Sequence, residues 1–188
     1  MTARYLLPVV LFAAAIAPLP AMAASVTVAA GELAIITDPE TAESRALLRF
    51  ELPDELEGVT VEFATVEYAA SVSPGDTTGA LTLDVFPVTT EWHGDTVGWA
   101  DGWSTAGGDF DREVHAVWTA LSGESSVVRF DVTDMVAGWL SGTHPNHGII
   151  VRRAPGEAGA AVPVGSGGEH GDPVLTIWYT GPEGRGRQ

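Results

Sequence analysis

The sequence predicts an all-β fold, either a sandwich or a barrel. Three observations point to it: short segments alternate apolar and polar residues, the 22 glycines and 12 prolines recur between them, and only one segment has helical spacing. Alternation with a period of two is typical of strands with one buried face, and glycine and proline mark the turns that join such strands. A chain of 188 residues can bury one substantial core.

The expected strands follow one another along most of the chain. They span residues 26–28, 46–52, 59–72, 81–86, 127–132, 149–151 and 174–179. In the segment 59–72 the alternation changes phase, because Val61 and Phe63 share one face whereas Val66 and Tyr68 continue in the other register. A β-bulge near Ala64 would account for this change.

One short helix is expected after residue 132. Thr133 stands where a helix N-cap is favoured, and Asp134 follows in the first turn. Val136 and Leu140 lie one helical turn apart. Gly142 ends this helix after about two turns.

The first 23 residues are expected to be a signal peptide. Arg4 supplies the positive charge, residues 6–19 form an apolar run, and Ala21 and Ala23 frame a small-x-small cleavage site. The run is short for a bilayer span, and an uncleaved N-terminal anchor is the alternative. We therefore expect residues 24–180 to form one secreted domain, extracellular or periplasmic, followed by a disordered tail over residues 181–188. No later segment approaches the length of a membrane span.

The absence of cysteine and the net charge of −16 exclude several functions. Without cysteine there is no disulfide, thiolate metal site or cysteine nucleophile. All nine basic residues are arginines, and so acidic a domain repels nucleic acid and anionic membranes. It should also repel polyanionic polysaccharides unless cations bridge them or the few arginines cluster. Solubility is the simpler interpretation of the charge.

Five blocks of the chain match, in order, the pattern of one family. They are residues 46–52 (ALLRFEL), 90–99 (TEWHGDTVGW), 107–111 (GGDFD), 130–148 (FDVTDMVAGWLSGTHPNHG) and 166–179 (SGGEHGDPVLTIWY). With these blocks the chain resembles the DNRLRE-domain family, which is related to disaggregatase-type modules and to an alginate-recognising class of carbohydrate-binding modules. The resemblance covers nearly all of residues 26–180. It implies a jelly-roll-like antiparallel β-sandwich with one short helix, often attached to extracellular enzymes or adhesins.

Trp103 and Trp118 are the candidate ligand-binding residues. Aromatic rings pack against the apolar faces of pyranose rings. Trp103 lies in a glycine-rich loop, residues 101–108, and Trp118 precedes a turn at residues 121–123. Binding residues are disproportionately found on loops.

The other four tryptophans have structural interpretations. Trp92, Trp99 and Trp139 match aromatic positions of the family pattern and are expected to be packing residues. Trp178 alternates with Ile177 in the last strand, so it belongs either to the core or to an exposed edge.

Asp109 and Asp111 are the candidate metal ligands. They lie at alternate positions of a glycine-framed loop, and such carboxylates can contribute to the six to eight oxygen ligands that Ca²⁺ takes. A structural Ca²⁺ is therefore the one cofactor to test, and a merely solvated acidic loop is the alternative. His144 and His147 flank a proline and are interpreted as turn residues.

The motifs do not indicate an enzyme. No Ser-His-Asp signature, nucleophile elbow, phosphate-binding glycine loop or H-E-x-x-H motif occurs in the sequence. Our first hypothesis is an exported, non-catalytic module that binds extracellular polysaccharide. The alternative is a structural or adhesive component of the cell envelope or matrix that acts through protein contacts, and a polysaccharide lyase or hydrolase is a distant third.

Overall fold

The computed structural model describes residues 23–71, 80–121, 125–155, 162 and 172–181. Residues 1–22 of the predicted signal peptide, the predicted turn at 122–123 and residues 182–188 of the predicted tail lie outside these ranges. Within them, no helix is long and apolar enough to cross a membrane.

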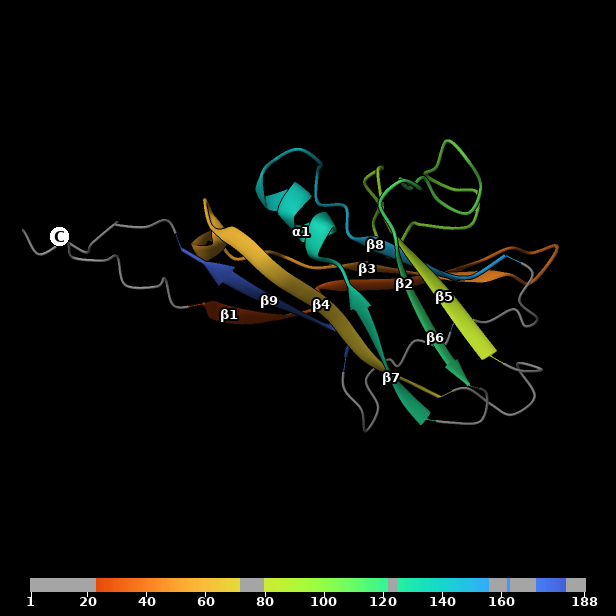
Figure 1. Cartoon of the computed structure of the whole chain (residues 1–188). Coiled ribbons are helices and arrows are strands. Elements are labelled where there is room, and N and C mark those ends of the chain that lie inside the picture. The colour runs from red at the N-terminus through yellow and green to blue at the C-terminus, as the bar shows by residue number, and fades with distance from the viewer. Residues whose placement is uncertain (1–22, 72–79, 122–124, 156–161, 163–171, 182–188) are drawn as a thin grey trace, which may run out of the picture.

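Two antiparallel sheets form the molecule (Figure 1). The spatial order in the first is β1 (Ala24–Ala29), β9 (Val174–Thr180), β4 (Thr60–Ser71) and β7 (Ser125–Asp131). The order in the second is β2 (Glu32–Thr37), β3 (Ser44–Arg49), β8 (Ile149–Arg153), β5 (Ala80–Pro87) and β6 (Ala116–Leu121). Apart from β2, which is added at one edge, this is the strand order of a jelly roll. The predicted antiparallel β-sandwich is therefore confirmed.

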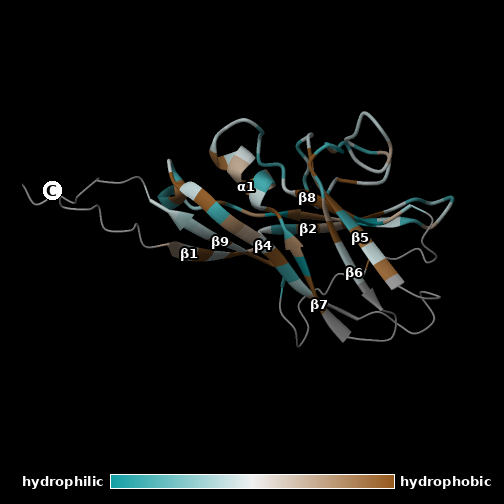
Figure 2. Ribbon diagram, viewed as in Figure 1, coloured by the Kyte–Doolittle hydropathy of each residue, from teal (hydrophilic) through white to brown (hydrophobic). Residues whose placement is uncertain are grey.

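Alternate residues of both sheets form the main core between them. Leu48 of β3, Leu83 of β5, Phe130 of β7 and Ile177 of β9 are fully buried there. In Figure 2 the apolar residues concentrate on the strands, whereas the long loops are mostly polar. Removing this apolar surface from water is the main favourable contribution to folding. The inward-facing residues of both sheets therefore meet in one core.

The α-helix, α1 (Thr133–Leu140), packs against β4, and a 3-10 turn, η1 (Asp54–Leu56), precedes that strand. The prediction of Thr133 as the N-cap is wrong, because the cap position is Val132 and its side chain forms no capping bond. Instead, Asp131 accepts hydrogen bonds from the backbone nitrogen and the hydroxyl of Thr133, at 3.0 and 2.6 Å. The same hydroxyl accepts one from the backbone nitrogen of Ala64 at 3.0 Å and so ties the helix start to β4.

The predicted bulge exists, but it lies earlier in β4 than expected. The pairing of β4 with β9 shifts between Val61 and Phe63. Because the extra residue precedes Phe63, this ring points to solvent and is 42% exposed, while Val61 packs against the core. The prediction that Val61 and Phe63 share a face is therefore wrong.

Two strands, β2 and β6, were not predicted from the sequence. Both carry apolar residues on both faces, which hides the alternation. In β2, Leu33 packs on the main core, while Ala34 and Ile36 belong to a second cluster on the outer face. In β6, Trp118 packs inward, and its neighbour Val117 is 52% exposed.

Candidate functional site

The long segment between β5 and β6, residues 88–115, folds over the outer face of the five-stranded sheet (Figure 1, green). Beneath it lies a second, smaller apolar cluster, which we call the outer cluster. Its buried members are Ala34, Ile36, Leu47, Phe86, Val88, Trp92 and Ile150, with Val97, Trp99, Trp103 and Phe110 packed against them. Satellite clusters of this kind hold long loops in place.

Trp92 holds the start of this loop to the sheet. Only 3% of the residue is exposed, and its indole N–H donates a 2.7 Å hydrogen bond to the carbonyl of His147. The guanidinium of Arg49 lies 5.4 Å from the indole ring and donates to the Trp92 carbonyl at 3.0 Å. Glu32 forms an ion pair with Arg49 and accepts a hydrogen bond from the backbone nitrogen of Gly94. The predicted packing role of Trp92 is therefore confirmed.

Arg45 of β3 ties down the other end of the loop. Its Nη1 donates to the carbonyl of Gly107 at 2.7 Å, and its guanidinium lies 4.6 Å from the centre of the Trp99 ring. Gly107 has a φ of 90°, and a Cβ there would come within 2.7 Å of Arg45 Nη1 and 3.0 Å of Trp99. Glycine is therefore required for the loop to approach Arg45 this closely.

Three arginines surround a single aromatic ring on this face. The guanidinium carbons of Arg45, Arg112 and Arg152 lie 5.8, 5.2 and 5.5 Å from the centre of the Phe110 ring. Phe110 packs against Phe86, with ring centres 4.9 Å apart. Three of the nine arginines of this acidic chain therefore cluster.

Arg152 is a partly buried member of the arginine cluster, with 17% of its side chain exposed. Burial lowers its pKa, the carboxylate of Asp84 at 3.6 Å opposes that change, and the positive charges of Arg45 and Arg112 reinforce it. Its Nε is buried and has no hydrogen-bond partner among the described residues. An anion near these guanidinium groups would relieve their mutual repulsion.

A shallow polar cleft of about 340 Å³ opens beside Phe110. It is lined by Thr89, Thr90, Ser104, Thr105, Gly108, Asp109, Phe110 and Arg112. Arg112 is exposed and forms no ion pair with any residue that the structure describes. The cleft thus combines hydroxyl groups, an aromatic ring and an exposed guanidinium.

Asp109 organises the wall of this cleft. Its carboxylate accepts hydrogen bonds from the backbone nitrogen and hydroxyl of Ser104, the hydroxyl of Thr90 and the backbone nitrogen of Thr105, at 2.7 to 3.1 Å. Burial opposes ionisation, but these bonds outweigh it and lower the pKa of Asp109 below its usual value. Asp111 accepts one bond, from the backbone nitrogen of Glu113 at 2.9 Å.

The surroundings of Asp109 and Asp111 bear on the predicted calcium site. The carboxylate oxygens of Asp109 already accept four hydrogen bonds. Within the described ranges, no group of three or more His, Asp or Glu side chains could hold a metal ion. Calcium at Asp109 and Asp111 stays a prediction.

Replacing Asp109 with asparagine is expected to loosen the loop. An amide nitrogen cannot accept the bonds that one carboxylate oxygen receives, so the free energy of unfolding should fall by about 1–2 kcal/mol at pH 7. A carboxyl whose pKa is lowered on folding stabilises the fold above its unfolded pKa, about 3.9, and loses that contribution as pH falls through the folded pKa. Urea titrations at pH 7 and pH 3 should therefore show a difference that shrinks at pH 3. Asp95→Asn, at an exposed position of the same loop, is the control and should match the wild type at both pH values.

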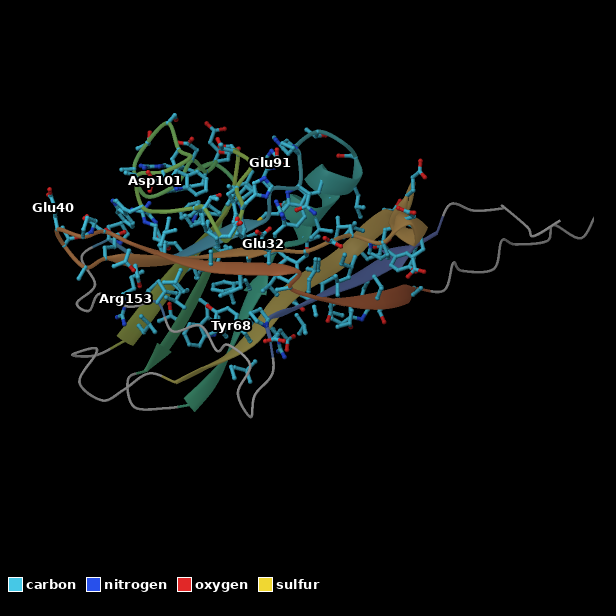
Figure 3. The ribbon with its side chains drawn as sticks, turned by 180° about the vertical axis from the view of Figure 1, so that it is seen from behind. Glu32, Glu40, Tyr68, Glu91, Asp101 and Arg153 are labelled. Carbon is cyan, nitrogen blue, oxygen red and sulfur yellow. The ribbon has the colours of Figure 1, made fainter. Side chains whose placement is uncertain are left out.

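A second cleft, of about 530 Å³, lies on the other side of the loop. Its lining includes Trp99, Ala106 and residues of the β2–β3 hairpin, together with the carboxylates of Asp38, Glu40 and Asp101. Figure 3 shows Asp101 in the loop and Glu40 at the tip of the hairpin, at the same end of the molecule. Trp99, predicted as a packing residue, is partly buried against the outer cluster and also lines this acidic cleft.

The structure does not bring Trp103 and Trp118 together. Trp103 packs against the outer cluster, and its indole N–H donates to the carbonyl of Gly98 at 2.8 Å. Trp118 lies opposite Leu83 in β6 and packs against the main core, on the other face of the same sheet. The two side chains cannot form one platform, and the part that each plays in binding stays a prediction. The feature that sequence reasoning missed is the pair formed by the partly buried Phe110 and the exposed Arg112, although Phe110 lies within the GGDFD block.

Comparison with known protein families shows to which family the chain belongs. The model of carbohydrate-binding module family 96 matches residues 22–179. The chain belongs to this family. No curated protein matches it.

Membership of carbohydrate-binding module family 96 fixes the general function. Such modules are non-catalytic, so the chain binds polysaccharide and is not an enzyme. The finer resemblance to DNRLRE-domain proteins stays a prediction. A polysaccharide needs an accessible surface with aromatic and hydrogen-bonding groups, and the loop-covered face of the five-stranded sheet provides both.

Proposed function

We propose that this module binds an acidic polysaccharide outside the cell and that Arg112 takes the carboxylate of a uronate residue. The observation that carries this proposal is the group of three guanidinium carbons, each less than 6 Å from the Phe110 ring, in a chain whose net charge is −16. Two of these arginines have carboxylate partners, Glu43 for Arg45 and Asp84 for Arg152. Arg112 has no carboxylate partner in the part of the chain that the structure describes, and we assign it to the ligand.

The chemistry of the Arg112 cleft suits a uronate. A guanidinium can bind a carboxylate with two parallel hydrogen bonds, which are charge-assisted and directional. The Phe110 ring offers an apolar face to the pyranose, and the hydroxyls of Thr89 and Thr105 can exchange hydrogen bonds with those of the sugar. By contrast, the carboxylates around the Trp99 cleft would repel a uronate. Charge therefore favours the Arg112 side of the loop.

The extracellular location rests on sequence evidence. The predicted signal peptide would export the chain, and the related modules named above are often attached to extracellular enzymes or adhesins. Polysaccharides with uronate residues occur outside cells, where an exported module would meet them. Protein contacts in the cell envelope are the competing role.

Arg112→Gln is expected to weaken binding to alginate, used here as the uronate probe, by at least tenfold. The variant loses the carboxylate contact but keeps a side chain of similar length, and a tenfold loss corresponds to about 1.4 kcal/mol. Isothermal titration calorimetry at low and at physiological salt would measure it. Affinity should fall with added salt for the wild type and less steeply for the variant, because surface charges are screened.

Arg129→Gln is the matched control. It removes the same charge from β7 of the four-stranded sheet, where the Arg129 side chain is 62% exposed and paired with Glu67 of the adjacent strand β4. Alginate affinity should be unchanged in this variant. Equal losses in both variants would show that net charge alone drives binding and would overturn the assignment to Arg112. Repeating the titration in EDTA tests the predicted calcium.

A further inference from the structure

The outer face of the four-stranded sheet carries an exposed aromatic pair. Phe63 of β4 and Trp178 of β9 are register partners, with ring centres 5.4 Å apart and planes inclined by 32°. Phe63 is 42% exposed, and Trp178 is partly exposed. The bulge between Val61 and Phe63 creates this pair, because it moves the phenylalanine from the core side to the solvent side.

Hydroxyl groups surround the two rings. In the registers of the sheet, Ser25 lies opposite Trp178, and Thr176 and Thr180 lie two residues away along β9. Successive side chains of a strand alternate between faces, so these residues share the face of the rings. Thr180 donates a 2.9 Å hydrogen bond to Glu62, which leaves that carboxylate at the edge of the aromatic pair.

The aromatic pair continues into a cleft of about 700 Å³. Phe63 and Glu62 form one side of this cleft, the start of α1 and the start of β6 form the others, and its acidic lining includes Glu113, Asp131 and Asp134. This volume lies within the usual range for ligand sites, about 300–1,000 Å³. Nothing basic is among its lining residues except His115.

We propose that the Phe63–Trp178 pair and the adjoining cleft form a second carbohydrate-binding surface, which takes an uncharged polysaccharide chain. Pyranose rings present apolar C–H faces to aromatic rings and hydroxyls at their edges, which matches two rings set among serine and threonine. Carboxylates accept hydrogen bonds from sugar hydroxyls but repel uronates, so Glu62 and the acidic cleft select against charge. A protein partner would have to bury the surrounding hydroxyls and carboxylates together with the rings, which is unfavourable unless each is paired.

The Phe63–Trp178 pair and the Arg112 cleft lie on the outer faces of opposite sheets, so both can be occupied at once. The adjoining cleft is lined in part by Glu113, Val114 and His115, which follow Arg112 in the same loop. The module would then join an acidic chain to a neutral one. Because each surface prefers a different polymer, either proposal can fail without the other.

The test uses the full chain and a soluble neutral polymer, galactomannan or hydroxyethyl cellulose, in affinity gel electrophoresis. Phe63→Ala and Trp178→Ala should each weaken retardation by the neutral polymer at least tenfold and leave alginate binding unchanged. Val127→Ala, at a position 58% exposed on β7 of the same sheet, is the control and should bind as the wild type does. Thermal melts of all three variants establish that they are folded.

Two results would overturn the proposal. The first is neutral-polymer binding that survives both aromatic substitutions. The second is a wild-type chain that binds neither neutral polymer but sediments as a dimer, with dissociation caused by Trp178→Ala, which would assign the aromatic pair to a contact between copies. Loss of alginate binding in Arg112→Gln bears only on the other site.

Discussion

Alanine in place of Gly148 is expected to prevent stable folding, with the free energy of unfolding lowered by more than about 3 kcal/mol. Gly148 has a φ of 79°, where residues with a Cβ are disfavoured. A Cβ there would lie 2.1 Å from the carbonyl oxygen of Leu48 and 2.9 Å from Cα of Arg49. Neither atom can easily retreat, because both belong to β3, which is paired on both sides, with β2 and β8.

Gly142→Ala separates the two causes of this effect. Gly142 has a φ of 72°, but no other atom lies within 4 Å of where its Cβ would be. Gly142→Ala should therefore lower the free energy of unfolding only through its disfavoured backbone conformation, by about 1–2 kcal/mol. Urea titrations of both variants measure the difference. If Gly148→Ala were no less stable than Gly142→Ala, the close approach to β3 would not be the reason for glycine at position 148.

Trp92→Ala is expected to lower stability by about 3–5 kcal/mol and to abolish alginate binding. The substitution empties the centre of the outer cluster and removes the hydrogen bond to His147. It also removes the ring beside Arg49. Because the outer cluster holds the loop that carries Arg112, the binding cleft should lose its shape even in molecules that remain folded.

Two variants make the Trp92 experiment specific. Trp92→Phe keeps most of the buried ring and loses the indole N–H, so a cost of about 1–3 kcal/mol is expected from the unpaired carbonyl. Trp178→Ala removes a tryptophan from a solvent-facing position and should destabilise far less. Chemical denaturation followed by alginate titration gives both readouts. A Trp92→Ala protein that bound alginate with wild-type affinity would show that the loop keeps its shape without the outer cluster.

The alternation of apolar and polar residues predicted the strands wherever one face is buried and the other is exposed to solvent. Leu83 and Phe130, for example, lie in segments of regular alternation, and both are buried in the main core. The same reasoning failed for Phe63, because a phase change in the sequence does not say at which residue the bulge occurs. It failed for β2 as well, because the loop that buries its outer face comes from residues more than fifty positions away.

The candidate site was predicted only in part. The loop around Asp109 was identified from its glycines and carboxylates, and it does form the wall of a cleft. The arginines could not be assigned, since Arg45, Arg112 and Arg152 lie far apart in the sequence and carry no shared motif.

The sequence by itself determined the fold class and indicated a non-catalytic polysaccharide-binding module, because these follow from strand periodicity and from motifs in a fixed order. Only the tertiary structure decided which surfaces can bind. Pairing of β3 with β8 and the return of the loop bring three distant guanidinium groups to one phenylalanine ring, and a single inserted residue turns Phe63 outward beside Trp178. Side chains that meet across strands depend on long-range register, which no local pattern in the sequence specifies.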